Sequence, residues 1–218
     1  MKAELLRSKI CLYGITMQET NPEQLLEKVR AAAAGGMTML QIRQKQMPAE
    51  KLVALAAPVL EFCRQNGILC LINDQVEAAR MLSADGVHVG QNDMCIPQAR
   101  AILGSDAIIG TSVHSVEEAV QAQKDGADYI GCGAVFPTGT KTDATPLSME
   151  TLCSIRKAVT IPMVAIGGIT AENAALLKGS GIDGIAVVSA IFGQENPEQA
   201  AQTMKNLAQQ IVQEGASL

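Results

Sequence analysis

Aromatic side chains are scarce in this chain of 218 residues, which has two Tyr, three Phe and no Trp. Basic residues are not in excess either, since the formal net charge is −5. Proteins that bind nucleic acid usually need a basic surface and aromatic platforms on which bases stack. The composition therefore argues against nucleic acid as a partner and favours chemistry on small molecules.

The six cysteines form no C-x-x-C pair, and no histidine stands at ligand spacing from them. This pattern argues against a zinc site or a redox motif and predicts buried thiols in a reducing compartment. No apolar run is long enough to cross a bilayer. The first eleven residues also lack the apolar stretch of a secretory signal. We therefore expect a soluble cytoplasmic protein that does not contact a membrane.

Short apolar runs do alternate with longer amphipathic stretches along the whole chain, which is typical of β-α units around a parallel sheet. Eight runs have strand composition: Ile10 to Thr16, Met37 to Arg43, Ile68 to Ile72, Gly86 to Val89, Ala107 to Ser112, Tyr129 to Gly133, Met163 to Ile166 and Gly184 to Val188. Helices are expected between them, including Pro22 to Ala34, Pro48 to Gln65, Ser115 to Lys124 and Pro197 to Gln213. Without any linker, this pattern predicts one domain over residues 1–218 with the (β/α)8 TIM-barrel fold.

A short phrase recurs before three of these strands, in which a small residue and Asp precede the apolar run. Its aspartates are Asp85, Asp128 and Asp183. Glycine suits the end of a helix and Asp suits a turn. Residues at the N-terminal ends of barrel strands usually serve stability. We expect these three carboxylates to be structural.

The C-terminal ends of the strands build the active site of a barrel, so the polar residues there are the candidates. The second strand ends in Gln41, Ile42, Arg43, Gln44 and Lys45. In extended chain, residues 41, 43 and 45 point to the same side. An amide and two cations together favour an anion site, although a solvated surface run is the alternative.

Carboxylates follow the third and fourth strands. Asp74 comes directly after Asn73 at the end of the third strand, and Asp93 follows the fourth. Mg²⁺ takes oxygen ligands and prefers one or two carboxylates together with water and substrate phosphate. The pair therefore predicts a Mg²⁺ site. Asn73 and Asp93 would equally suit caps of the helices that follow, and the sequence leaves this alternative open.

The segment after the sixth strand combines hydroxyls, a glycine and a cation in Thr138, Gly139, Thr140 and Lys141. This composition suits phosphate oxygens, although the spaced Gly-Lys-Ser/Thr of a Walker loop is absent. Its length without apolar residues suggests a mobile loop that closes over substrate.

A second phosphate site is expected after the last two strands. Gly167 and Gly168 follow the seventh strand, and Ser189 follows the eighth. Backbone N–H groups in these two loops form the phosphate site that many barrels share. Packing alone would explain one glycine, but the two loops in this order favour phosphate binding.

Both histidines lie near strand ends. His88 stands between two valines in the fourth strand, and we expect it to be buried with its hydrogen bonds satisfied. His114 follows the fifth strand, two residues after Ser112. Histidine suits acid–base chemistry, and the role of His114 is left open.

In this order the segments resemble thiamine phosphate synthase, over nearly the whole chain from Tyr13 to Ile191. The motifs that carry the resemblance are Gln41-x-Arg43-x-Lys45, Ile72-Asn73-Asp74, the stretch from Gly86 to Asp93, Phe136-Pro137-Thr138-x-Thr140-Lys141 and the stretch from Ala165 to Ile169. Two positions differ, since Gln44 stands where the family often has Glu and Ser148 where Gly is common. Gln44 is expected to face away from Arg43, so both differences should have little effect.

The resemblance implies a role for each candidate residue. The family joins a hydroxymethylpyrimidine diphosphate to a thiazole phosphate. The pyrimidine diphosphate would be bound by Gln41, Ile42, Arg43, Gln44, Lys45, Asn73, Ser112 and Lys141. The thiazole phosphate would be bound by Thr138, Gly139, Thr140, Gly168, Val188 and Ser189. Asp74 and Asp93 would hold Mg²⁺, and the catalytic residues would be Arg43, Lys141 and Ser112.

The reaction implied by the resemblance is loss of diphosphate to leave a pyrimidine cation, which the thiazole nitrogen captures. One rival is a related barrel that acts as a thiazole tautomerase, with an acid–base residue and no Mg²⁺ pair. Another is a barrel that senses thiamine phosphates without turnover. The joint presence of Asp74, Asp93, Arg43, Lys45 and Lys141 favours the synthase. Assembly into a homo-oligomer is left open.

Overall fold

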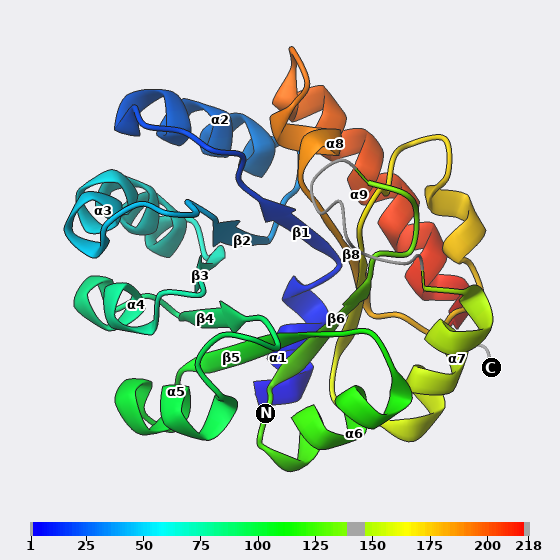
Figure 1. Ribbon diagram of the computed structural model, residues 1–218. Coiled ribbons are helices and arrows are strands. Elements are labelled where there is room, and N and C mark those ends of the chain that lie inside the picture. The colour runs from blue at the N-terminus through cyan, green and yellow to red at the C-terminus, as the bar shows by residue number, and fades with distance from the viewer. Residues whose placement is uncertain (1, 139–146, 216–218) are drawn as a thin grey trace.

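The apolar runs form parallel strands that pair in chain order and close into a barrel, in which β8 pairs with β1 (Figure 1). The computed structural model describes residues 2–138 and 147–215. The strands are β1 (Leu12–Ile15), β2 (Met39–Ile42), β3 (Leu69–Asn73), β4 (Gly86–Val89), β5 (Ile108–Val113), β6 (Tyr129–Gly133), β7 (Met163–Ile166) and β8 (Gly184–Val187). The predicted (β/α)8 barrel is confirmed, and every predicted strand is present with ends that agree within two residues.

Helices surround the barrel because each presents an apolar face to the strands. They are α2 (Pro22–Ala34), α3 (Ala49–Gln65), α4 (Val76–Leu82), α5 (Ile96–Leu103), α6 (Val116–Lys124), α7 (Met149–Ala158), the 3₁₀ helix η1 (Ala174–Leu177), α8 (Ser189–Phe192) and α9 (Pro197–Gly215). The four helices expected from the sequence are confirmed. Asn21 caps α2 and Ser115 caps α6 through their side-chain oxygens. Ser148 likewise caps α7, which gives that family difference a structural role.

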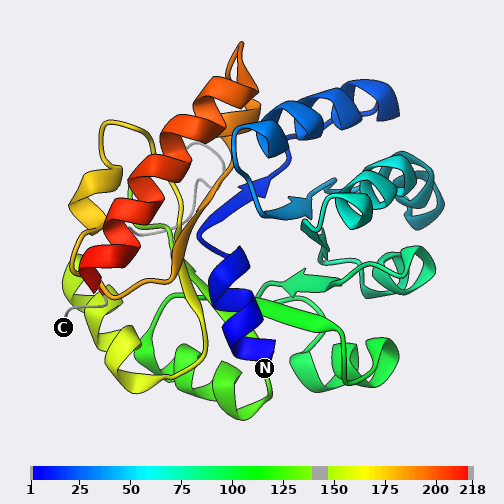
Figure 2. The ribbon, with the colours of Figure 1, turned by 180° about the vertical axis from the view of Figure 1, so that it is seen from behind.

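The N-terminal helix α1 (Lys2–Lys9) is not among the helices expected from the sequence. It lies across the opening at the N-terminal ends of the strands (Figure 2). Leu6 and the following Ile10 are fully buried and pack with Tyr13 inside the barrel. Only one residue of the helix itself is buried, so its sequence carries almost no helical periodicity. This helix closes one end of the barrel and leaves the other end for a site.

The three recurring aspartates lie at the end of the barrel that α1 covers. Each carboxylate accepts a hydrogen bond of 2.8 Å from a backbone N–H of the preceding strand, and the pairs are Asp85 with Cys70, Asp128 with Ile109 and Asp183 with Met163. Arg100 also pairs with Asp128, and Arg156 with Asp183. The predicted structural role of these carboxylates is confirmed.

Two apolar layers fill the molecule, one between strands and helices and one inside the barrel. The inner layer includes Tyr13, Met39, Leu71, Ile108 and Tyr129, so the barrel has a packed floor.

The prediction of buried thiols holds for only part of the cysteines. Cys63, Cys70 and Cys132 are buried, whereas Cys95 is exposed and the other two are partly exposed. Cys95 is exposed because it stands just before the first residue of α5, at the helix cap. In the part of the chain that the structure describes, none of the helices has both the length and the apolar character needed to cross a membrane.

Candidate active site

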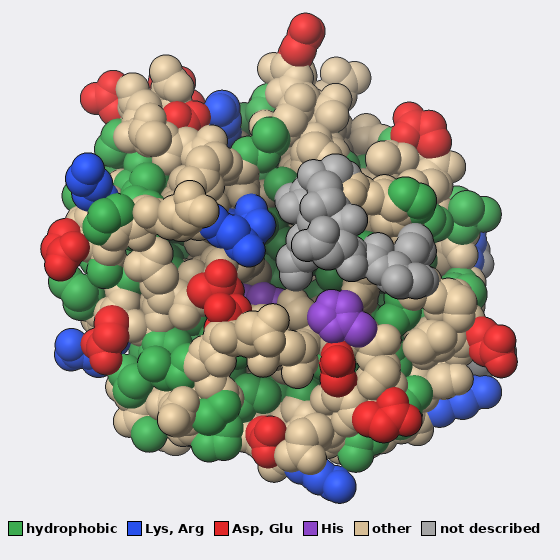
Figure 3. Space-filling view, in the orientation of Figure 1, with side chains coloured by type: hydrophobic (Ala, Val, Ile, Leu, Met, Phe, Trp, Pro, Cys, Tyr) green, Lys and Arg blue, Asp and Glu red, His purple; other side chains and the backbone are tan. Residues whose placement is uncertain are grey.

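A pocket opens at the C-terminal ends of the strands, opposite α1. Figure 3 shows this face, where basic, acidic and histidine side chains gather around a central hollow. Residues on or just after all eight strands line the pocket. Eight of the predicted site residues are among them: Gln41, Arg43, Asn73, Ser112, Thr138, Gly168, Val188 and Ser189.

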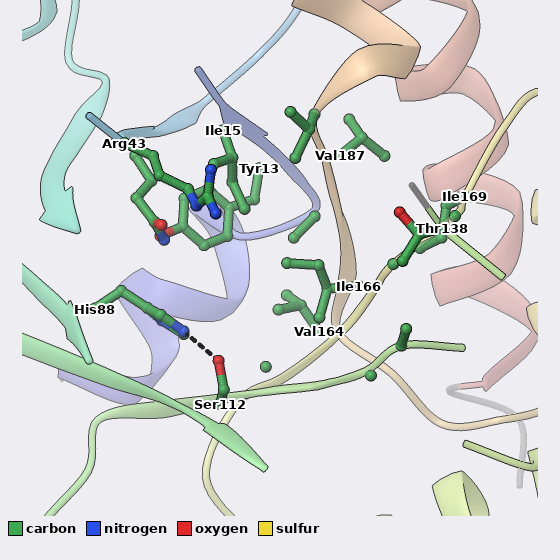
Figure 4. A pocket seen from close by; sticks show the side chains of 18 of the residues that line it. Tyr13, Ile15, Arg43, His88, Ser112, Thr138, Val164, Ile166, Ile169 and Val187 are labelled. Atoms are coloured by element: carbon green, nitrogen blue, oxygen red, sulfur yellow. Dashed lines mark hydrogen bonds between the residues drawn. The ribbon is translucent and has the colours of Figure 1, made fainter. Parts of the chain in front are cut away.

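Polar side chains lie on opposite sides of this pocket. Figure 4 shows Arg43 on one side and Thr138 on the other, with the side chains of Val164, Ile166 and Val187 between them. The pocket therefore offers a cationic side and a hydroxyl side separated by an apolar wall. Such a shape suits two anionic groups on either side of flat, weakly polar rings.

The two predicted metal ligands, Asp74 after β3 and Asp93 after β4, lie within hydrogen-bonding reach of each other. Burial, then the hydrogen bond and the charge of Asp93, raise the pKa of Asp74 to about 6, while Asn73 and Lys45 act in the opposite direction. Two carboxylates in contact favour a shared proton or a bound cation. The described residues hold no group of three or more His, Cys, Asp or Glu side chains that could by themselves hold a metal ion. Substrate oxygens and water would therefore complete the shell of a Mg²⁺ ion, as this ion prefers.

The alternative of helix caps is wrong for both Asn73 and Asp93. The cap of α4 is Gln75 and that of α5 is Cys95. Asn73 instead ends β3 and lines the pocket. The Asp93 carboxylate accepts a hydrogen bond of 2.7 Å from the Gly90 N–H, which closes the turn after β4.

The sequence predicts that the side chains of residues 41, 43 and 45 point to the same side, and two of the three line the pocket. Gln41 and Arg43 line the pocket, whereas Lys45 does not and its charge acts on Asp74 instead. Strand β2 ends at Ile42, so the alternation of an extended chain does not continue to Lys45. Lys45 therefore belongs beside the carboxylate pair.

The side chains of Ile42 and Gln44 do not line the pocket. Ile42 is buried between barrel and helices. The buried amide of Gln44 donates to the Met17 carbonyl at 3.2 Å and accepts from the Glu19 N–H at 3.0 Å. Gln44 thus faces away from the pocket, as expected, and supports the segment after β1. Any contact of these two residues with substrate would come from their backbone.

Gly168 brings the loops after β6 and β7 together. Its φ is +65°, and a Cβ atom there would lie 2.3 Å from the Pro137 carbonyl oxygen. Only glycine permits this close approach. The contact places Thr138 beside the Gly168 backbone on the hydroxyl side of the pocket. Gly139, Thr140 and Lys141 lie outside the described residues, so the predictions for them, including a closing loop, stay predictions.

A chain of hydrogen bonds between largely buried side chains lies in the pocket wall, and it is not among the expectations drawn from the sequence. The Gln41 Nε2 donates to the Tyr13 hydroxyl at 2.7 Å, and the two tyrosine hydroxyls are 2.9 Å apart. The Tyr129 hydroxyl lies 2.8 Å from His88 Nδ1, and His88 Nε2 lies 3.0 Å from Ser112 Oγ. The predicted buried, satisfied histidine is confirmed. One signal is available in the sequence, because Tyr13 and Tyr129 are the only two tyrosines of the chain and both lie in strands.

His114 lies at the edge of the pocket and is partly exposed. Its Nδ1 is 3.0 Å from a Glu118 oxygen, and the same oxygen accepts from the His114 backbone N–H at 2.7 Å. This contact joins the end of β5 to the first turn of α6.

The family model described as Thiamine monophosphate synthase matches residues 12–191. The chain belongs to this family. A thiamine-phosphate synthase of Ruminiclostridium cellulolyticum is 46% identical over 202 residues, which are 91% of this chain and 96% of the relative. A thiamine-phosphate synthase of Moorella thermoacetica is 44% identical, over 84% of this chain and 87% of that protein.

Comparison with solved structures supports the same family, thiamine monophosphate synthase. A thiamine phosphate pyrophosphorylase from Pyrococcus furiosus has a TM-score of 0.86 and 40% identity, covering 94% of this chain and 98% of that one. A 3-hexulose-6-phosphate synthase with 13% identity and a TM-score of 0.65 shares the fold alone. The predicted resemblance is confirmed, and so is the prediction of an enzyme, a transferase of thiamine biosynthesis.

Proposed function

We propose that this chain condenses 4-amino-2-methyl-5-hydroxymethylpyrimidine diphosphate with a thiazole phosphate, giving thiamine phosphate and diphosphate. The observation that carries the proposal is the contact of Asp93 with Asp74, which directly follows a residue of the pocket wall, next to a pocket lined by Arg43 and Thr138. One side thus suits a metal-bound diphosphate, and the other suits a phosphomonoester.

The diphosphate side is built from cations and carboxylates. The guanidinium of Arg43 extends into the pocket, where its planar fork suits phosphate oxygens (Figure 4). Asp74 and Asp93 would hold Mg²⁺, because a cation offsets the burial and the repulsion by Asp93 that raise the pKa of Asp74. When bound, Mg²⁺ would offset the negative charge that grows on the leaving diphosphate. Lys141 is predicted to act on the same group.

The phosphomonoester side is built from hydroxyls and backbone. Thr138 and Ser189 offer hydroxyl groups, and Gly168 leaves its backbone accessible beside them. Val188 lines the same part of the pocket just before α8. This set suits the thiazole phosphate, which carries less charge than the diphosphate and needs no metal.

The reaction requires that the two substrates are positioned and that the leaving diphosphate is stabilised, and it requires no nucleophile from the protein. The bond between the pyrimidine methylene carbon and the diphosphate oxygen breaks, and its electron pair leaves with the oxygen. The thiazole nitrogen then donates its lone pair to the carbon, so no proton has to move. Arg43 stabilises the leaving group, and the apolar wall of Val164 and Ile166 keeps water from the cation. Holding both rings in one pocket supplies much of the remaining rate effect.

The tautomerase and the sensor remain the alternatives to test. A tautomerase has no need of the Asp74–Asp93 contact, which therefore favours the synthase. The cytoplasmic location and the open question of a homo-oligomer stay as predicted from the sequence.

Omitting each substrate in turn separates the three functions. The purified protein is incubated with Mg²⁺ and the pyrimidine diphosphate, the thiazole phosphate, or both, and products are separated by chromatography. A synthase forms thiamine phosphate only with both substrates. Rearrangement of the thiazole phosphate alone would indicate the tautomerase, and binding of thiamine phosphate without any turnover would indicate the sensor.

A further inference from the structure

A continuous chain of side-chain hydrogen bonds joins Gln41 to Ser112 in the wall of the pocket, through Tyr13, Tyr129 and His88. Both end residues line the pocket, and so do Tyr13 and His88, so Tyr129 is the member of the chain that lies behind the wall. Figure 4 shows the last link, between His88 and Ser112. The chain therefore links the part of the pocket wall at Gln41 to the part at Ser112.

The amide of Gln41 sets the direction of this chain, because an amide nitrogen only donates. The Tyr13 oxygen accepts from Gln41, and because this hydroxyl is buried its single proton also needs an acceptor, which the Tyr129 oxygen provides. The single Tyr129 proton then goes to Nδ1 of His88, which must accept. A neutral imidazole that accepts at Nδ1 carries its proton on Nε2. His88 therefore donates to Ser112 Oγ.

We propose that Tyr13, Tyr129 and His88 are positioning residues. Their hydrogen bonds form a relay from Gln41 to Ser112, and this relay fixes which side-chain atom donates and which accepts at each end. At one end Gln41 donates an amide N–H to Tyr13, which leaves its side-chain oxygen as an acceptor on a residue that lines the pocket. At the other end Ser112 is kept from donating to His88, so its own proton is available to a ligand. The identity of the ligand rests on the proposed function. An aminopyrimidine diphosphate has amino N–H groups that can donate to an acceptor, and oxygens and ring nitrogens that can accept from a hydroxyl.

The relay is held rigidly. Tyr13 and Tyr129 are at most 1% exposed and pack edge to face, with ring centres 5.9 Å apart. Gly110 leaves room for the Tyr129 ring, because a Cβ atom there would lie 2.1 Å from it. Burial raises the pKa of both phenols, so each keeps its one proton and the direction is maintained. Packing alone would be satisfied by phenylalanine, which has no hydroxyl to place.

The tautomer of His88 tests the relay without any substrate. The chain has only two histidines, so protein labelled with ¹⁵N-histidine gives two imidazole signals, and a His114→Asn variant identifies that of His88. We expect the His88 proton on Nε2 in the free protein at about pH 9, where an ordinary imidazole is neutral. Ser112→Ala should leave it there, because the direction is set at the other end.

Gln41→Glu should reverse the relay. A carboxylate only accepts, so each proton turns toward it and His88 takes the Nδ1–H form. A proton on Nδ1 in the parent protein, or the same tautomer in the parent and this variant, would overturn the proposal.

Tyr129→Phe provides a second test that keeps the packing of the ring. We expect kcat/KM for the pyrimidine diphosphate to fall about tenfold, which corresponds to the free energy of about one hydrogen bond. The KM for the thiazole phosphate should not change. Thr111→Val is the matched control, since it removes another buried hydrogen bond, to the Val89 carbonyl, on the same strand as Ser112. Equal kinetic effects in both variants would show that the relay has only a structural role and would overturn the proposal. If the parent makes no product at all, the proposed function fails, while the tautomer still decides the relay.

Discussion

The carboxylates of Asp74 and Asp93 lie within hydrogen-bonding reach at the ends of neighbouring strands, and burial together with this contact raises the pKa of Asp74 to about 6. Such a contact is unfavourable for the free protein and favourable once a divalent cation binds. We therefore expect the pair to support turnover and to lower the stability of the metal-free protein, and each effect can be measured.

Asp74→Ala should lower turnover by at least about 100-fold, because removal of a metal ligand weakens a metal site by more than the loss of its outer partners. The fold should remain intact, which circular dichroism would check. Glu27→Ala, a change at an exposed carboxylate on α2, is the matched control and should keep full activity. Unchanged turnover in Asp74→Ala would show that Asp74 is not a required ligand.

Asp74→Asn should stabilise the metal-free protein in a pH-dependent way. Folding raises the pKa of this carboxyl from 3.8 to about 6, so its ionised form opposes folding, and the parent loses stability as the pH rises through this window. The variant lacks this loss. Asparagine also tolerates the φ of +59° at this position.

Thermal melts in chelator would measure that effect. The gain in Tm from Asp74→Asn should be largest above about pH 6 and should shrink toward pH 4. A gain that does not depend on pH would mean that folding does not raise the pKa of Asp74.

Arg43→Lys should weaken use of the pyrimidine diphosphate, because lysine keeps the charge but loses the planar fork. We expect kcat/KM for this substrate to fall by about 10- to 100-fold, with KM for the thiazole phosphate nearly unchanged. Steady-state kinetics with each substrate varied would show it. Arg64→Lys, at an exposed ion pair with Glu61, serves as the control, and an equal loss there would point away from the pocket.

Gly168→Ala should impair the thiazole phosphate side. The new methyl group would collide with the Pro137 carbonyl and displace Thr138, so KM for the thiazole phosphate should rise at least about tenfold. Gly179→Ala is a close control, because Gly179 also has a positive φ, of 77°, but a Cβ atom there would meet no atom of the described residues within 4 Å. That variant should lose about 1 kcal/mol of stability and keep its kinetics. Similar KM values in the two variants would contradict the placement of this site.

The barrel is predictable from the sequence because strand composition and the recurring aspartates are local signals that repeat along the chain. Asp85 and Asp128 each bond to the backbone of the strand just before their own, so the pattern and its purpose are close in sequence. Helix α1 escapes prediction because a single buried leucine leaves no periodicity to detect.

The site is harder to predict where contacts join distant residues. Lys45 is absent from the pocket lining, and because β2 ends at Ile42 the alternation of an extended chain does not reach residue 45. The link from Tyr13 to Tyr129 spans 116 positions and lies inside the barrel, so no local motif announces it. The assignment of ligands to pocket residues comes from the family resemblance, because residue types alone do not distinguish a diphosphate from a phosphomonoester.

Metal-dependent turnover tests the central claim most directly. The purified protein is given both substrates with Mg²⁺, then with a chelator, then with Mg²⁺ restored, while thiamine phosphate and diphosphate are quantified together. We expect equal amounts of the two products, loss of both in chelator, and recovery when the metal returns. Folded protein that forms no thiamine phosphate, or forms it unchanged in chelator, would contradict the assignment of Asp74 and Asp93.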